Sequence, residues 1–170
     1  MRGQIIMIRI LVFGLSTGMG GVETYLMNIY RNIDRTKIQF DFVVSGTDCY
    51  YSNEIKGLGG HIFYVTPKKH NVILNIMDVL KVLKGCKHTH RVVYFNLSVL
   101  YYNLPFIFAT LYRFPIIVSH GHSARGKRIK KSIRYYLHCL NRIYVVYASN
   151  YFLACSSLAG RWIFGDKTVE

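Results

Sequence analysis

The stretch that decides the fold runs Ile10-Leu11-Val12-Phe13-Gly14-Leu15-Ser16-Thr17-Gly18-Met19-Gly20-Gly21-Val22-Glu23. An apolar β-type run leads through a glycine-rich turn into the start of a helix. An open α/β sheet presents backbone N–H groups to an anion in this way, because glycines permit positive φ and close approach and the helix N-terminus adds its dipole. The spacing fits neither the G-x-G-x-x-G dinucleotide fingerprint nor a P-loop, which needs a lysine. Two interpretations stay open: a generic phosphate-binding turn, and a tight connection that binds no ligand.

Short apolar runs alternate with helical periodicity along the rest of the chain. We expect strands at residues 5–13, 40–45, 61–65, 92–95, 116–119 and 152–155, and helices at 22–33, 73–83, 100–111, 127–148 and 158–164. This alternation predicts an α/β fold with a doubly wound, mostly parallel sheet and helices on both faces. In such a sheet ligands gather at the carboxyl ends of the strands. The 170 residues are expected to form one domain with no internal linker.

Charge is distributed unevenly along the chain. Twenty-two lysines and arginines against eight acidic residues give a formal net charge of +14. Residues 1–78 hold eight basic and six acidic side chains, whereas residues 79–165 hold thirteen basic ones and no acidic one. This asymmetry favours an anionic partner such as lipid headgroups or phosphorylated small molecules, although a solvated basic surface needs no partner. We expect no nucleic-acid binding, because the strands are predicted to be buried on both faces and leave no exposed basic and aromatic sheet.

The helix expected at 127–148 combines an apolar stripe with basic side chains. The stripe is expected to face the sheet and comprises Ile129, Ile133, Leu137, Leu140, Tyr144 and Tyr147. A membrane or anion patch is expected at Lys127, Arg128, Lys130, Lys131 and Arg134. Basic residues beside an aromatic-rich stripe suit an anionic membrane surface. An ordinary core helix with snorkelling side chains is the open alternative.

Several classes of protein are disfavoured. The dispersed Cys49, Cys86, Cys139 and Cys155 predict neither a disulfide framework nor a zinc site, and indicate a reducing compartment. The N-terminus does not read as a signal peptide. Residues 92–112 lack formal charge and have spanning length, but their polar residues and Pro105 favour a buried strand followed by a buried helix.

Candidate chemistry follows the strand expected at 116–119. Ser119-His120-Gly121-His122-Ser123 would lie at the ligand-binding edge, where histidine can hydrogen-bond a phosphate or sugar hydroxyl or act as an acid or base. Arg125 and the basic residues after it suit an anionic group. A purely structural role for the histidines stays open, and a metal site lacks a third ligand nearby. His88-Thr89-His90, beside several basic residues, is expected to be a solvated loop.

The order of these motifs resembles the family 4 retaining glycosyltransferases with the GT-B fold. The resemblance is carried by residues 8–12, Gly20-Gly21-Val22-Glu23-Thr24, Ser119-His120-Gly121-His122, Phe152-Leu153-Ala154-Cys155-Ser156-Ser157 and residues 160–165. It extends from about Met7 to Gly165. The similar enzymes are bacterial transferases that build exopolysaccharide, capsule or lipopolysaccharide. The resemblance implies two Rossmann-like domains, the first binding the acceptor and the second binding the nucleotide-sugar donor through paired glutamates.

Residue roles follow from the resemblance alone. It implies that Gly20 and Gly21 bind the donor diphosphate, that His120 is catalytic, and that Glu23, His122 and Arg125 bind a glycan or lipid-linked acceptor. It also implies that a nucleotide-sugar is a co-substrate, with no metal or other cofactor. These residues correspond to the first domain only, so we expect the fragment to be inactive without the donor domain. A cytoplasmic location, including peripheral attachment to the inner face of the cell membrane, is expected.

Overall fold

The computed structural model describes residues 7–123 and 132–168. Its elements follow the order β1 (Ile8–Leu15), α1 (Gly21–Asn32), β2 (Ile38–Ser45), α2 (Ser52–Gly57), β3 (Ile62–Val65), α3 (Val72–Cys86), β4 (His90–Leu97), α4 (Leu104–Leu111), β5 (Ile116–Gly121), α5 (Ile133–Ala148), β6 (Tyr151–Ala154), α6 (Ser157–Phe164) and the 3-10 helix η1 (Asp166–Thr168). The six expected strands are confirmed with shifted ends. The six-residue α2 was not expected, because it is too short to show a periodic pattern.

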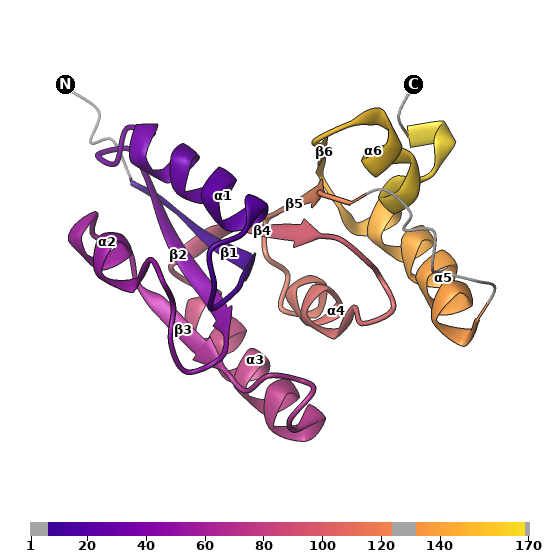
Figure 1. The fold of residues 1–170 in the computed structure, drawn as a ribbon, viewed down its shortest axis with the longest axis horizontal. Helices are drawn as coiled ribbons and strands as arrows, with labels where there is room; N and C mark the ends of the chain where they lie inside the picture. Colours follow the sequence, from indigo (N-terminus) through magenta and orange to yellow (C-terminus); the bar gives the residue numbers. More distant parts are fainter. Residues whose placement is uncertain (1–6, 124–131, 169–170) are drawn as a thin grey trace.

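The six strands form one parallel sheet in the order β3-β2-β1-β4-β5-β6 (Figure 1). Every neighbouring pair is parallel. The order reverses between β1 and β4, which lie side by side at the centre. A doubly wound sheet binds ligands at such a switch point, outside the carboxyl ends of the strands. The expected Rossmann-like α/β fold is therefore confirmed.

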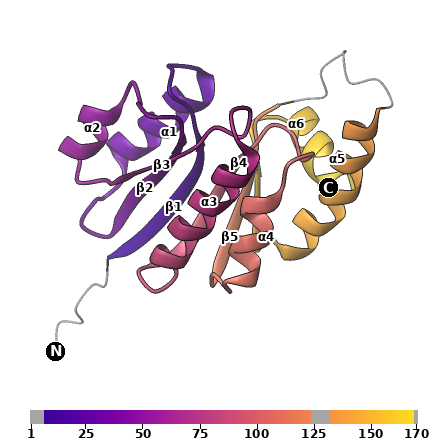
Figure 2. The same cartoon turned by 90° about the horizontal axis from the view of Figure 1, so that it is seen from below.

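Helices cover both faces of the sheet. In Figure 1, α1 lies on one side of the strands and α3 and α4 lie on the other. Figure 2 shows α3, α4 and α5 side by side. Leu26 of α1 packs in a buried cluster with Phe42 of β2, whereas Leu83 of α3 and Phe106 of α4 pack with Val93 of β4. Both sheet faces are buried there, which explains the near-continuous apolar runs of the central strands.

The orientation of α5 corrects a sequence prediction. Ile133, Leu140 and Tyr147 are exposed by 73%, 65% and 89%, and Leu137 is also exposed, so the prediction that these residues face the sheet is wrong. Ile129 lies outside the described residues, and Tyr144 packs partly against the core as expected. The inward face carries buried His138, whose Nδ1 accepts from Leu100 N–H (3.0 Å) and whose Nε2–H donates to the Trp162 carbonyl (3.0 Å). Helical periodicity sets which residues share a face, but these polar contacts set which face turns inward.

The uncharged run at 92–112 forms most of β4 and all of α4, as the interpretation of a strand followed by a helix predicts. In the part of the chain that the structure describes, no helix combines the length and the apolar character needed to cross a bilayer. All four cysteines are free thiols.

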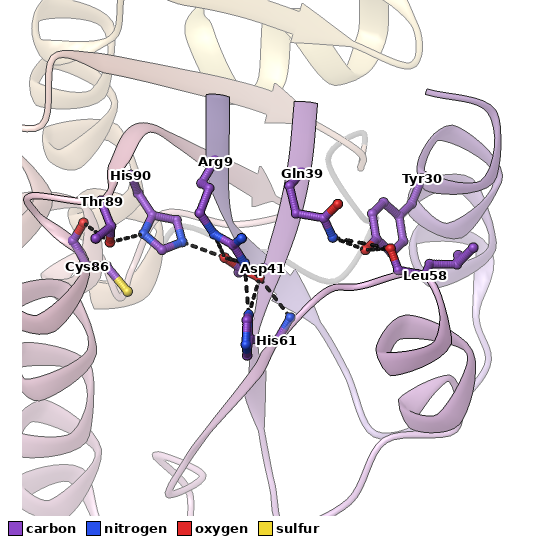
Figure 3. A network of polar contacts seen from close by, with 9 residues as sticks. All are labelled: Arg9, Tyr30, Gln39, Asp41, Leu58, His61, Cys86, Thr89 and His90. Carbon is purple, nitrogen blue, oxygen red and sulfur yellow. Dashed lines mark hydrogen bonds and ion pairs between the residues drawn. The ribbon is translucent and has the colours of Figure 1, made fainter. Parts of the chain in front are cut away.

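One buried carboxylate joins the amino-terminal halves of neighbouring strands (Figure 3). Asp41 of β2 is 1% exposed and accepts from Arg9 Nε (2.7 Å), Arg9 Nη2 (2.6 Å), His90 Nε2 (2.7 Å) and the His61 backbone N–H (2.7 Å). The expectation that residues 88–90 are a solvated loop is therefore wrong for His90. Burial alone would raise the pKa of Asp41, but the bonds from His90 and Arg9 outweigh it and lower the pKa to about 2.

Candidate functional site

The corner after β1 is held against the end of β4. Gly14 has a φ of +105°, and a Cβ at this position would lie 2.6 Å from the Cβ of Asn96. The Asn96 amide donates to the Phe13 carbonyl (2.7 Å). A side chain at residue 14 would therefore be strained and would also displace Asn96. This contact places the glycine-rich turn beside the carboxyl ends of β4 and β5.

The start of α1 is open to solvent at Gly21. Gly20 is the N-cap in an extended conformation with φ −121°, and neither Gly20 nor Gly21 has a positive φ. Their role therefore does not depend on the left-handed region. A Cβ at Gly21 would meet no heavy atom within 4 Å, whereas a Cβ at Gly20 would lie 2.6 Å from Glu23 Oε2. A ligand can thus approach the helix N-terminus at Gly21 without displacing protein atoms.

Glu23 already occupies part of this turn. Its side chain is buried, and Oε1 accepts from the backbone N–H of Ser16 (3.1 Å). A carboxylate in the first turn of a helix is also favoured by the helix dipole. An anion bound here would therefore have to lie beside Glu23, on the Gly21 side of the turn.

The two predicted histidines lie next to this helix. The rings of His120 and His122 are 4.0 Å apart between centroids, and Tyr25 of α1 lies edge-on to both, at 5.1 and 5.5 Å. The structure thus brings Glu23, His120 and His122 to the same edge of the sheet as the glycine turn. Sequence analysis missed Tyr25 and also Asn96, although Asn96 follows directly on an apolar strand.

Both imidazoles are neutral at pH 7. His120 is 3% exposed and shares a hydrogen bond with the Tyr94 hydroxyl; burial and the neighbouring His122 lower its pKa to about 4. Burial also lowers the pKa of His122, and the negative charge of Glu23, which acts to raise it, offsets only part of this effect. Because the Asn96 amide nitrogen donates to the backbone, its oxygen accepts from His122 Nε2–H (2.7 Å). His122 therefore has Nδ1 as its hydrogen-bond acceptor.

Burial limits what His120 can contact. A ligand reaches the His120 ring only if neighbouring side chains such as Tyr25 shift, whereas His122 is half-buried. Arg134 lies at the start of α5, with its guanidinium 5.7 Å from the Tyr101 ring centroid. Five predicted residues lie outside the described ranges: Arg125, Lys127, Arg128, Lys130 and Lys131.

Two cavities adjoin the glycine turn. One of about 520 Å³ lies between the segments after β1, β2 and β3, and is lined by Ser16, Thr17, Ser45, Thr47 and Lys68 among others. A second of about 300 Å³ shares Ser16, Ser45 and Lys68. Sequence analysis missed both, although these hydroxyls lie at or within a few residues of the ends of predicted strands. A larger cavity of about 650 Å³ lies at the opposite edge, by Arg9 and His90, away from the strand ends where such sheets bind ligands.

The described residues do not form a cluster of metal ligands. Within residues 7–123 and 132–168, no three His, Cys, Asp or Glu side chains are grouped as ligands. The arrangement instead combines an open helix N-terminus, a pair of neutral imidazoles and hydroxyl-lined cavities. These groups can bind phosphate oxygens and sugar hydroxyls.

The fold defines a Rossmann-like α/β domain, and the groups at this edge are a candidate site for a polar or anionic ligand. No protein-family model matches the chain. The chain is 31% identical over 159 residues to "Putative glycosyltransferase EpsF" of Bacillus subtilis (strain 168). The match covers 89% of this chain and 39% of that protein, so the chain spans about two fifths of its relative. The chain is thus similar to one part of a protein named as a putative glycosyltransferase.

A solved structure has a similar fold. The crystal structure of Acinetobacter baumannii MurG superposes with a TM-score of 0.56, covering 88% of this chain and 41% of that chain. The two sequences are 10% identical, so this likeness shows the fold alone.

Proposed function

We propose that this chain is the acceptor-side domain of a GT-B glycosyltransferase. The complete enzyme transfers a sugar from a nucleotide-sugar donor to a glycan or lipid-linked acceptor, with retention, in the synthesis of an exported polysaccharide. One observation carries the proposal. An open helix N-terminus and a neutral imidazole pair meet at one carboxyl edge, in a chain 31% identical to a protein named as a glycosyltransferase.

Each group has a distinct role in this proposal. Negative charge builds on the departing diphosphate, and the backbone N–H groups at Gly20 and Gly21, with the dipole of α1, stabilise it. A neutral His120 hydrogen-bonds the reacting sugar without adding charge. Glu23, His122 and Arg125 bind the acceptor. The nucleotide-sugar is a co-substrate, and no metal or other cofactor takes part.

Catalysis in this proposal requires a second domain that binds the donor. The test joins residues 1–165 to the part of the Bacillus relative that lies beyond the matched region. Release of nucleoside diphosphate from a panel of nucleotide-sugars is then measured, with bacterial lipid extract as the source of acceptors. The isolated chain should release none, and the fusion should turn over at least one donor.

A matched pair of variants tests the diphosphate contact in that fusion. Gly21 and Gly57 are both helical glycines at which a Cβ would meet nothing within 4 Å. Gly21→Leu should lower donor turnover at least about tenfold by obstructing the helix N-terminus, whereas Gly57→Leu in α2 should leave it unchanged. Equal turnover in both variants would contradict the role of Gly21. Sugar transfer by the isolated chain would contradict the proposal that catalysis needs a second domain. A fusion that folds but turns over no donor would contradict the proposal that this chain is a glycosyltransferase domain.

A second candidate function is attachment to an anionic membrane surface at the cytoplasmic face. The exposed stripe on α5, formed by Ile133, Leu137, Leu140, Ile143 and Tyr147, favours it. Apolar residues beside basic ones bind membrane interfaces, and each basic residue near the surface contributes about 1 kcal/mol. Attachment is compatible with the transferase, since a lipid-linked acceptor lies in the same membrane.

Sedimentation with phosphatidylglycerol vesicles tests this attachment. The double variant Leu140→Gln/Ile143→Gln should reduce the bound fraction strongly, because both side chains are exposed and would enter the interface. Tyr50→Gln, which removes an exposed aromatic ring beside α2, is the control and should bind as the unmodified chain does. Equal loss in both variants, or no binding at all, would refute membrane attachment by α5.

A further inference from the structure

Three segments that follow the strands β3, β4 and β5 bring two cations to one aromatic ring. Lys68 comes after β3, Tyr101 after β4, and Arg134 after β5. The Lys68 Nζ lies 5.1 Å from the ring centroid of Tyr101 and 4.6 Å from that of Tyr102. The Arg134 Cζ lies 5.7 Å from the Tyr101 centroid. These contacts are far apart in sequence, so only the fold assembles them.

The described part of the chain does not neutralise this cluster. Its ion pairs involve Asp41, Glu54, Asp34 and Asp166, and none involves Lys68 or Arg134. Burial and then the charge of Arg134 lower the pKa of Lys68, because both oppose its charged form. The tyrosine rings offset part of this cost through cation–π attraction. A bound anion would offset the remaining cost of holding these two cations close together.

Lys68 also lines the two cavities beside the glycine turn. Their other polar lining includes the hydroxyls of Ser16, Thr17 and Ser45, the Asn75 amide, and Lys69 and His70 at one side. Ammonium groups and hydroxyls together are strong donors to phosphate oxygens. Hydrogen bonds hold the lining residues Asn75 and Tyr102 in place. The Tyr102 hydroxyl donates to the side-chain oxygen of Asn75, and the Asn75 amide nitrogen donates to the Thr66 carbonyl (2.6 Å).

We propose that Lys68, Arg134 and the hydroxyl-lined cavities beside them form a binding site for a phosphate or diphosphate group. Its assignment to the acceptor rests on the proposed function: the site would hold the phosphate of a lipid-linked sugar acceptor while the sugar extends toward His122. Val72, Ile73 and Leu74, at the start of α3 shortly after His70, expose apolar side chains that suit a lipid-borne phosphate.

Calorimetric titration with inorganic pyrophosphate tests the site on the chain of residues 1–170. Lys68→Gln should weaken binding at least about tenfold, the usual loss for one charge-assisted contact. Lys68→Arg keeps the charge and should bind within a few-fold of the unmodified chain. Lys56→Gln, in the helix α2 between β2 and β3, makes the same change in net charge and should have little effect.

A second arm distinguishes the source of the phosphate. Phosphatidylcholine vesicles carry either phosphatidic acid or an equal charge of a carboxylate lipid, and sedimentation measures binding. Lys68-dependent binding to phosphatidic acid alone supports a lipid-borne phosphate, and Lys68-dependent binding of pyrophosphate alone supports a free one. The proposal is overturned if Lys68→Gln and Lys56→Gln behave alike in both arms, or if neither probe binds saturably. Neither arm measures sugar transfer. The phosphate site can therefore be confirmed even if the proposed transfer reaction is not observed, and it can be refuted even if transfer is observed.

Discussion

Replacing Asp41 with asparagine should remove the contact that joins Arg9, His61 and His90 (Figure 3). The variant keeps the shape of the side chain but loses its charge. The amide nitrogen cannot accept a hydrogen bond, so at least one donor from Arg9 or His90 is left without a partner in a buried site. The unfolded chain gains nothing equivalent, so the folded state is selectively destabilised.

The pKa of Asp41 sets the magnitude and its pH dependence. A shift from the ordinary value of 3.8 to about 2 corresponds to about 2–3 kcal/mol of folding free energy. Because the folded-state pKa is lowered, this stabilisation is fully present above the ordinary pKa of 3.8. It is lost as the pH falls through the folded value of about 2. At neutral pH the variant should therefore be about 2–3 kcal/mol less stable, and the difference should vanish in strong acid.

Urea unfolding of both chains, followed by circular dichroism at neutral and acidic pH, measures this difference. Comparing the two proteins at each pH cancels the titration of all other groups. Asp34→Asn is the control, because Asp34 contacts Thr36 and Lys37 at the exposed surface, where solvent screens these interactions. A deficit of less than about 0.5 kcal/mol at neutral pH, or one that persists undiminished in strong acid, would refute the reasoning.

The His120 ring should titrate in NMR with a midpoint near pH 4, because burial and a neighbouring imidazole lower its pKa; a midpoint near the ordinary 6.5 would contradict its burial. Gly14→Ala should destabilise the fold by about 1–3 kcal/mol in urea unfolding, because φ is +105° and Asn96 lies in the way; an unchanged midpoint would show that the corner is not locked. His138→Phe should keep the stacking on Trp162 but leave the Leu100 N–H and the Trp162 carbonyl without their partner, which should lower the free energy of unfolding by about 2–4 kcal/mol. A variant as stable as the parent in thermal unfolding would show that those bonds contribute nothing.

Sequence reasoning located the strands well because their signal is local. Val92-Val93-Tyr94-Phe95 is apolar on successive positions, as a strand buried on both faces must be, and it forms the middle of β4. The glycine turn and the histidine loop each follow such a strand directly. The parallel topology then placed both at one carboxyl edge, as predicted.

The errors arose where distant residues decide the outcome. His90 stands among polar and basic neighbours, yet it is buried and its side chain reaches across β1 to bond Asp41, 49 residues earlier in the sequence. The stripe on α5 has the spacing of a core-facing surface, yet His138 turns inward because Leu100 and Trp162 offer it partners. Nothing in the sequence indicated that Lys68 and Arg134 both lie near the ring of Tyr101.

The sequence by itself determined the order of strands and helices, the doubly wound parallel class and the strand ends that carry polar chemistry. Those properties follow from local patterns: continuous apolar runs mark the buried strands, and a period of about 3.6 residues marks the helices. Only the tertiary structure decided which face of α5 is exposed, that Tyr25 lies against both histidines, and which cations meet at Tyr101. Burial and charge pairing depend on through-space neighbours, and the strand order selects those neighbours from segments far apart in the chain.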